Sequence, residues 1–274
     1  MTYKNNTSSG NVGVCGYSNH FLIAYSNCKP PKMTKTAVCV CSGGIDSTVT
    51  ATIASEEGYE LHFFHASYGQ RAEAREKEVV EEIASYLNAK ELKFAELPFL
   101  KELGGSSLTD KARSVPVGKE VNLDAEKETP STWVPCRNII LLANASAFAE
   151  VISADAIFVG FNAEEARSYP DNEKEFVDRY NAVLEKAVAS YCRPPIVKAP
   201  LVDLLKQEII KKGVEVKAPL QLTYSCYLGE KKHCGICESC QHRRRGFKDA
   251  GVEDPTKYKF TAETTKSAYL LKKR

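Results

Sequence analysis

The chain has 274 residues, enough to bury a real hydrophobic core, and one large domain with a small appendage is the expected organisation. Its formal net charge of +2 argues against a protein that merely coats nucleic acid, so we do not expect direct nucleic-acid binding. No apolar run approaches a membrane span and no signal-peptide pattern opens the chain, so the sequence predicts a soluble, cytoplasmic protein without membrane contact.

The first 33 residues, rich in Asn, Ser, Thr and Gly, form a predicted N-terminal extension. Their pattern fits an ordered arm about as well as a flexible segment, and we assign no chemistry to them. From residue 34 strand and helix patterns alternate, which is typical of an α/β domain, and we place this domain at residues 34–222. The predicted strands are residues 37–41, 61–66, 91–97 and 156–160, and the predicted helices run to about residue 57 and over 72–87, 138–151, 173–190 and 203–212.

Three connecting segments carry further predictions. Residues 98–132 contain glycine, serine, proline and charge but little periodicity, and a loop of that length in a compact domain suggests a lid. Residues 194–200 are predicted to form an extended link. Asp203 is the expected cap of the last predicted helix and Gly213 its expected stop.

The stretch Ser42-Gly43-Gly44-Ile45-Asp46-Ser47 connects the first predicted strand to the first predicted helix. Adjacent glycines allow a tight turn, and the helix start adds unpaired N–H donors and a positive dipole end. An ordinary strand-to-helix turn is the alternative, and the pattern is not a Walker A loop. The expected phosphate-binding residues are Cys41, Ser42, Gly43, Gly44, Ile45, Asp46, Ser47 and Thr48.

Four of the ten cysteines lie within residues 226–240, inside a predicted C-terminal region of residues 223–274. Cys226, Cys234, Cys237 and Cys240 have the spacing of metal ligands, and four thiolates close a tetrahedral Zn²⁺ site without leaving room for water. We therefore predict a structural zinc site. An iron–sulfur cluster is the alternative, because Cys-x-x-Cys-x-x-Cys also occurs in ferredoxins.

Two motifs place arginines where an anion would need them. Tyr68-Gly69-Gln70-Arg71 follows the second strand, at the sheet edge where ligands bind, and the Arg71 guanidinium could grip a carboxylate or phosphate. Trp133-Val134-Pro135-Cys136-Arg137-Asn138 opens an apolar helix, and Arg137 there needs a partner that a phosphate could supply. A solvated Arg71 is the alternative to the first reading, and ordinary packing is the alternative to the second.

Weaker signals follow the strand at residues 156–160. Asn162 and Asp171 could read the edge of a purine through their amide and carboxylate groups, although a helix cap explains Asp171 about as well. Lys206 could neutralise phosphate, although a solvated surface lysine is the commoner outcome.

These motifs in this order resemble the 7-cyano-7-deazaguanine synthase family of the N-type ATP pyrophosphatase superfamily. The resemblance runs from about residue 37 to residue 258. It includes the glycine–serine loop, Gly160-Phe161-Asn162-Ala163-Glu164-Glu165, Tyr169-Pro170-Asp171, the cysteines, Arg243 and Asp254-Pro255-Thr256.

The resemblance implies a Rossmann-like open parallel sheet of the adenine nucleotide alpha hydrolase type, with a small zinc-binding C-terminal subdomain. It also implies that ATP and Mg²⁺ activate the carboxylate of 7-carboxy-7-deazaguanine, that ammonia gives an amide, and that a second activation gives the nitrile. A homodimer is expected. The implied catalytic residues are Asp46, Ser47, Lys206 and Arg137, and the implied substrate-binding residues are Gln70, Arg71, Asn162, Tyr169 and Asp171.

Departures from the family pattern keep alternatives open. Cys136 stands where the family usually has glycine, and residues 166–172 differ from many bacterial members. A diverged relative could stop at the amide or join the deazaguanine to an amine of a protein acceptor. A tRNA sulfur transferase with an iron–sulfur cluster is a further alternative, and a zinc-binding interaction module without enzyme activity would leave the glycine–serine loop unexplained.

Overall fold

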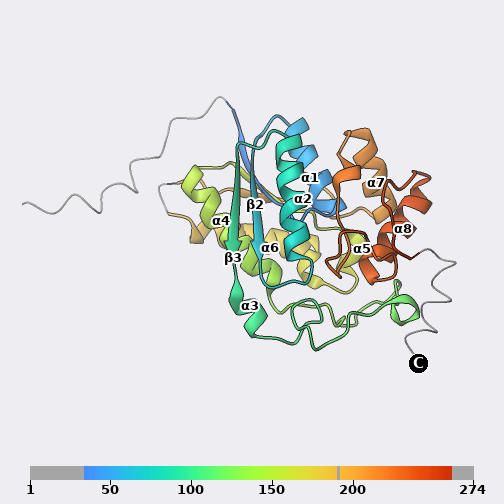
Figure 1. Cartoon of the computed structure of the whole chain (residues 1–274). Coiled ribbons are helices and arrows are strands. Elements are labelled where there is room, and N and C mark those ends of the chain that lie inside the picture. The colour runs from blue at the N-terminus through green and yellow to red at the C-terminus, as the bar shows by residue number, and fades with distance from the viewer. Residues whose placement is uncertain (1–33, 190–191, 261–274) are drawn as a thin grey trace, which may run out of the picture. The chain divides into compact units, whose positions relative to one another are not determined.

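The computed structural model describes residues 34–189 and 192–260, so the predictions for residues 1–33 lie outside the described part. Its centre is a parallel sheet of five strands in the order β3-β2-β1-β4-β5 (Figure 1). The strands are β1 (Thr36–Val40), β2 (Glu60–Ser67), β3 (Glu91–Glu96), β4 (Ala156–Phe158) and β5 (Ile196–Lys198). The predicted open parallel α/β fold is confirmed.

The strand order reverses beside β1, because β2 pairs with one of its edges and β4 with the other. Connections that leave the sheet in opposite directions open a crevice at the carboxyl ends of the two strands, and ligands of such sheets bind there. The segment that follows β1 is the predicted phosphate loop.

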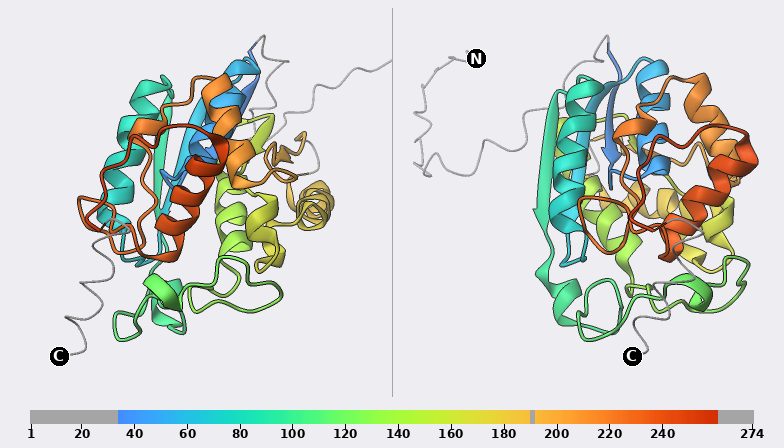
Figure 2. Two further views of the ribbon diagram at one scale, coloured as in Figure 1. Left: turned by 90° about the vertical axis from the view of Figure 1, so that its right-hand side faces the viewer. Right: turned by 45° about the vertical axis from the view of Figure 1, so that its right-hand side comes forward.

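Helices cover both faces of the sheet (Figure 2). α1 (Ile45–Glu56) and α2 (Glu73–Tyr86) pack on one face, against an apolar cluster that includes Phe63 and Phe158. α4 (Arg137–Ile152) and α6 (Lys174–Ala187) pack on the other, around Phe64 and Ile157. The central strands β1 and β4 thus send successive apolar side chains to opposite layers, which explains why their sequences read as nearly continuous apolar runs.

β5 lies within the stretch that the sequence predicted only as an extended link. It has three residues, too few to give a periodic signal, and it lies at the edge of the sheet. Its outward-facing peptide groups are paired with a side chain: Asn181 of α6 accepts from Val197 N at 2.8 Å and donates to Val197 O at 3.1 Å. This amide protects the edge from pairing with another strand.

The predicted limits of the helix at residues 203–212 were wrong. α7 runs from Lys206 to Glu215, and the Glu208 carboxylate accepts from Leu205 N at 2.8 Å at its start, so Asp203 is not the cap. Gly213 lies inside α7, where an added Cβ would come within 2.9 Å of Val49 Cγ2 on α1. This glycine permits close packing of two helices rather than ending one.

The cysteine-rich C-terminal region contains α8 (Glu238–Ala250), a helix that the sequence pattern did not predict. α7 and α8 pack beside α1 through a cluster that includes Ile209, Ile210 and Phe247. The four metal-site cysteines belong to the same apolar cluster as β1 and α2, so the segment from residue 223 onward shares its core with the sheet. A domain boundary at residue 222 remains a prediction.

Residues 103–132 are largely irregular, as predicted, and follow the short helix α3 (Pro98–Glu102). One 3₁₀ turn (Gly118–Glu120) interrupts them; two others, Pro170–Asn172 and Leu220–Leu222, and the short α5 (Ala163–Ala166) complete the described elements. Among the helices of the described residues, none combines the length and the apolar character needed to cross a bilayer.

A buried arginine joins the C-terminal region to the rest of the protein. Arg243 of α8 is 1% exposed, and its guanidinium donates to Thr223 Oγ1 at 2.7 Å and to Asp254 Oδ1 at 3.2 Å. The same group lies 5.0 Å from the centre of the Phe247 ring. Arg243 thereby connects α8 to two segments, at Thr223 and Asp254, that have no regular secondary structure of their own.

We expect Arg243→Met to lower the free energy of unfolding by about 3–5 kcal/mol, because it removes the charge partner of the half-buried Asp254 carboxylate and a donor to the buried Thr223 hydroxyl. Equilibrium urea unfolding followed by circular dichroism measures the change. Lys248→Met, at an exposed position of the same helix, is the matched control and should change stability by less than about 0.5 kcal/mol. Equal stability of the two variants would contradict the prediction.

Candidate functional site

The loop between β1 and α1 is shaped to hold an anion. Gly43 has a φ of +79°, and an added Cβ would come within 3.0 Å of Val79 Cγ1, so glycine is required for both conformation and space. The Ser47 hydroxyl accepts from Ser42 N at 3.2 Å and closes the loop on itself. No side chain caps α1. The N–H groups of its first turn therefore remain available to a ligand.

The carboxyl end of β4 lies directly against this loop. A Cβ on Gly160 would come within 2.7 Å of Ser47 N and 2.8 Å of the Asp46 carbonyl carbon. Both are backbone atoms, which cannot move aside without displacing the start of α1. Gly160 therefore fixes how closely β4 supports the loop.

A buried ion pair lies at the start of α1. Lys206, at the start of α7, is 7% exposed and donates to Asp46 Oδ2 at 2.6 Å, with Glu165 Oε1 at 3.8 Å. Burial raises the pKa of Asp46, and Lys206 opposes that shift. Burial alone would lower the pKa of Lys206, but the carboxylates of Asp46 and Glu165 outweigh it and raise the value. Asp46 Oδ1 is buried without a hydrogen-bond partner.

Glu164 joins four segments around this pair. Its carboxylate contacts Lys206 N at 3.1 Å, His242 Nδ1 at 2.6 Å and Arg245 at 2.6 Å, and Arg245 also donates to Asp124 Oδ1 at 2.7 Å. Burial works against the charged carboxylate, but hydrogen bonds from His242 and Arg245 hold the pKa of Glu164 far below its usual range. Glu164, His242 and Arg245 were not among the predicted site residues, although Glu164 lies in the motif of residues 160–165 and the other two in the run His242-Arg243-Arg244-Arg245.

These residues surround one cavity of about 510 Å³ at the carboxyl edge of the sheet, a size suited to a small-molecule ligand. Of the predicted site residues, the structure brings many together in its lining. They are Cys41, Ser42, Gly44, Ile45, Asp46, Ser47, Gln70, Arg71, Arg137, Tyr169 and Lys206. Gly43 in the loop and Thr48 at the start of α1 do not line the cavity. The Thr48 hydroxyl stabilises the loop by donating to Gly44 O at 2.7 Å.

The predicted substrate-binding residues divide into two groups. Asn162 and Asp171 lie outside the cavity lining; Asn162 is fully buried and caps α5 by accepting from Glu165 N at 2.9 Å. Arg71 lines the cavity, but its guanidinium donates to the carbonyls of Ser107 and Asp110 at 2.8 and 2.9 Å and to that of Arg113. Arg71 therefore holds the irregular segment of residues 103–132, which we call the long loop. Direct contact of these three residues with a substrate remains a prediction.

Aromatic and polar side chains form the wall opposite the phosphate loop. Tyr169 stacks on Trp133 at 5.8 Å between ring centres, and its hydroxyl lies 2.8 Å from Thr132 Oγ1. Arg137 donates from Nε to Asn138 Oδ1 at 3.1 Å. Cys136, just before α4, has a φ of +53°, a conformation that glycine adopts at lower cost.

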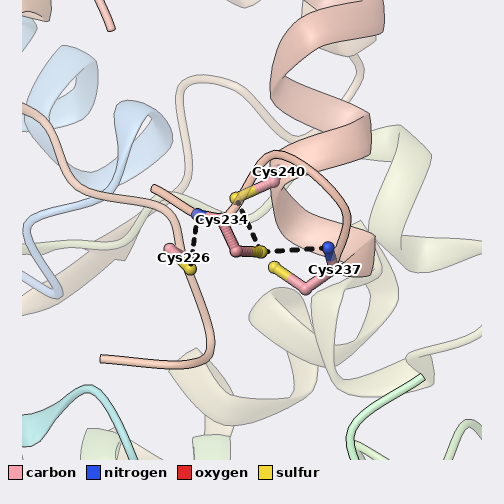
Figure 3. A group of neighbouring side chains, drawn as sticks. All are labelled: Cys226, Cys234, Cys237 and Cys240. Carbon is pink, nitrogen blue, oxygen red and sulfur yellow. Dashed lines mark hydrogen bonds between the residues drawn. The ribbon is translucent and has the colours of Figure 1, made fainter. Parts of the chain in front are cut away.

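The four cysteines of the C-terminal region form a separate cluster (Figure 3). Their sulfur atoms all lie within 4.8 Å of one another, and Cys234 Sγ is 3.8 Å from Cys240 Sγ. Tetrahedral Zn²⁺ with bonds of about 2.3 Å would require sulfurs about 3.8 Å apart, so the spacing fits this ion. Backbone N–H groups of Ile236 and Cys237 point at Cys234 Sγ, at 3.4 and 3.2 Å, and would stabilise a thiolate. The cluster is a metal-binding site.

His233 is not part of this cluster. Its Nε2 accepts from Ser225 N at 2.9 Å, and its ring packs 4.6 Å from that of Tyr224. Four cysteines therefore make up the donor set.

We expect Gly160→Ala to raise the Kd for ATP at least about tenfold, because the new methyl group displaces the backbone of Asp46 and Ser47. Isothermal titration calorimetry with ATP and Mg²⁺ measures the change. Gly58→Ala controls for general destabilisation, since Gly58 has a φ of +80° but no atom within 4 Å of the added Cβ. An unchanged Kd in Gly160→Ala would show that the contact does not shape the loop.

Comparison with known proteins places this geometry in a family. The family described as "Queuosine biosynthesis protein QueC" matches residues 36–251. The chain is similar to 7-cyano-7-deazaguanine synthases, with 56% identity over 81% of this chain and 98% of the relative from Methanothrix thermoacetophila. The relative from Methanobrevibacter smithii is 43% identical over 82% of this chain and 99% of its own length.

Likeness to solved structures is looser. NMN synthetase from Francisella tularensis has a TM-score of 0.40 and 13% identity, with 87% of this chain and 84% of that chain covered. The match to the family and to its curated relatives extends over the sheet, the phosphate loop and the four cysteines alike. The chain belongs to the QueC family of queuosine biosynthesis proteins.

Proposed function

We propose that this protein is an ATP-dependent 7-cyano-7-deazaguanine synthase, which converts 7-carboxy-7-deazaguanine and ammonia into the nitrile. The observation that carries the proposal is the open N-terminus of α1, with Lys206 beside it, at the edge of a cavity of ligand size. Relatives that carry this synthase name match over nearly their whole length.

The first chemical task is to make a carboxylate oxygen into a leaving group. Attack of the substrate carboxylate on a phosphate of ATP yields an activated acyl phosphate ester, and negative charge accumulates on the phosphate that departs. The N–H groups at the start of α1 and the Lys206 ammonium lie where they would stabilise that charge. The hydroxyls of Ser42 and Ser47 add donors at the same place.

The residues at this point also fit Mg²⁺. Asp46 Oδ1 is buried without a partner, and the Glu165 carboxylate lies near the same point, 3.8 Å from Lys206 Nζ. Carboxylate oxygens together with substrate phosphates are the usual ligands of this ion. Asp46 and Glu165 would hold it, and the bound ion would neutralise phosphate charge.

The rest of the cavity suits a flat, polar heterocycle. Tyr169 presents a ring held by Trp133, and Arg137 offers a guanidinium to the same cavity. Residues of the long loop, among them Ser131 and Thr132, complete the lining. A diverged enzyme that ends at the amide or uses a protein acceptor is not favoured, because the similar relatives are synthases.

Incubation with 7-carboxy-7-deazaguanine, ammonium, Mg²⁺ and ATP should give the nitrile, detected by mass spectrometry of the small molecules. Both ATP and ammonium should be required, because the cavity supplies a phosphate site and no side-chain source of nitrogen is needed. Omission of each in turn is the control. Amide as the sole product would contradict the nitrile-forming proposal, and no turnover of this acid would contradict the proposed substrate.

We further propose that the four-cysteine site holds Zn²⁺ in a structural role. Four thiolates complete a tetrahedral coordination sphere and leave no position for water, so the ion would stabilise the segment around residues 226–240 without taking part in the reaction. Homodimer assembly, cytoplasmic location and the use of free ammonia remain predictions.

The purified protein should be colourless and contain a single zinc ion per chain by plasma emission spectrometry, because the sulfur spacing fits Zn²⁺. Removal of the metal with a strong chelator should lower the unfolding temperature, since metal binding and folding are coupled. Cys192→Ser, outside the cluster, should leave the zinc content unchanged, whereas Cys237→Ser should reduce it. A brown protein containing iron would indicate the iron–sulfur alternative.

A further inference from the structure

Glu76 is a carboxyl group of the cavity that takes no part in the proposed activation of the substrate carboxylate. It lies in the first turn of α2 and lines the cavity between the phosphate loop and Arg137. Gln70 Nε2 donates to Glu76 Oε2 at 2.8 Å. Gln70 is itself fixed, since its Oε1 accepts from Tyr68 N at 2.8 Å and its Nε2 also donates to Ala66 O at 3.2 Å. The hydrogen bond from Gln70 to Oε2 therefore fixes the orientation of the Glu76 carboxyl group.

The second oxygen of this carboxyl group remains available. Within residues 34–189 and 192–260, no hydrogen bond or ion pair engages Glu76 Oε1. The neighbouring acids of α2 differ, because Glu73 is paired with Lys77 at 3.3 Å and Glu78 with Arg75 at 2.6 Å. Glu76 thus presents a held carboxyl group with one free oxygen to the cavity.

The other carboxylates that line the cavity are occupied or solvated. Asp46, Glu164 and Glu165 contact Lys206, His242 or Arg245; Glu120 and Glu128 are exposed; and Glu238 follows the metal-site residue Cys237 and accepts from Thr132. Among the described acids of the lining, Glu76 and Glu238 combine partial burial with the lack of a cationic partner in contact, and of these two Glu76 lies away from the cysteine cluster.

The amide-forming step needs such a group. Ammonia is mostly ammonium at neutral pH, and ammonium has no lone pair with which to attack an activated carboxyl. A base within the cavity must take one proton before the nitrogen can react, and general-base catalysis of this kind typically contributes about 10²–10⁴-fold.

We propose that Glu76 is the general base that takes a proton from ammonium bound beside the activated substrate. The proton moves from nitrogen to Glu76 Oε1, and the freed lone pair forms the new C–N bond at the acyl carbon. The C–O bond to the phosphate then breaks and its electron pair leaves with the phosphate oxygen. The nitrogen of the adduct still carries three hydrogens and gives its extra proton to the departing phosphate oxygen, and the glutamic acid returns its own proton to water. This inference rests on the proposed function.

The electrostatic surroundings of Glu76 agree with this role. Burial raises the pKa of Glu76 to about 7, opposed by the hydrogen bond from Gln70 and by the charge of Arg137 on α4, and reinforced by Glu73. Tyr68, in the turn after β2, and His65, on β2, are further titratable groups of the same cavity lining. A base with a pKa near the working pH is about half ionised there and still basic enough to accept a proton.

The test compares wild type, Glu76→Gln and Glu78→Gln in the same reaction with two nucleophiles, ammonium and hydroxylamine. At pH 7 we expect kcat/KM for ammonium to fall about 100-fold in Glu76→Gln and to stay within twofold in Glu78→Gln. Hydroxylamine is mostly unprotonated at this pH and needs no such base. Glu76→Gln should therefore form the hydroxamate at nearly the wild-type rate, which also shows that folding and activation are intact.

The pH dependence gives a second readout. Wild-type kcat/KM for total ammonium should rise with pH up to about 7 and then level off, because ionised Glu76 is required. In Glu76→Gln the rate should keep rising about tenfold per pH unit up to pH 9, following free ammonia, so the gap between the two proteins closes.

The outcomes separate the two proposals. Wild type that forms neither nitrile, amide nor hydroxamate from this acid would overturn the proposed function. If wild type is active and Glu76→Gln loses activity equally with ammonium and with hydroxylamine, Glu76 only shapes the cavity. An increase in KM for the deazaguanine alone would make Glu76 a substrate contact. Either of the last two results would overturn the assignment of Glu76 as base.

Discussion

The contact between Lys206 and Asp46 is the interaction on which the candidate site depends. It joins the starts of α7 and α1, so two helices far apart in sequence meet at the phosphate loop. A buried pair of this kind costs desolvation energy, and its partners must be held closely for attraction to offset that cost. Glu164, Arg245 and His242 provide that support, and through them α5, α8 and the long loop are arranged around the same point.

The sequence predicted the phosphate loop and the metal site because each is written in consecutive residues whose chemistry depends little on the rest of the fold. Gly43 needs a positive φ wherever this turn occurs, and cysteines at metal-ligand spacing suit a metal in any context. The roles of Arg71 and Asn162 depend instead on which segment lies opposite, and the structure shows them holding a loop and capping a helix. Glu164 was missed for the same reason, since its partners are about 40 to 80 residues away.

The secondary-structure predictions also succeeded where the signal is local and failed where it depends on distant residues. Long periodic segments such as α2 were predicted within a residue or two, because Val79, Val80 and Ile83 form a clear apolar face. β5 was read only as an extended link, and α8 was not recognised. β5 is three residues long, and α8 begins among metal ligands and carries a run of basic residues. Gly213 was misread because close packing against Val49, which no local pattern reveals, explains it better than a helix end.

The long loop that lines the cavity is completed by residues much later in the chain. Gly118 N donates to Ile236 O at 2.8 Å, and Gln241 Nε2 donates to Gly118 O at 3.0 Å. During synthesis, β1 to β5 leave the ribosome before these partners do, and proteins begin to fold as their N-terminal parts emerge. The sheet and the phosphate loop can thus form on a chain whose long loop is held by Arg71 but still lacks its contacts at Gly118. An unfinished polypeptide would therefore carry the loop that follows β1 before the cavity wall at Gly118 has its final position.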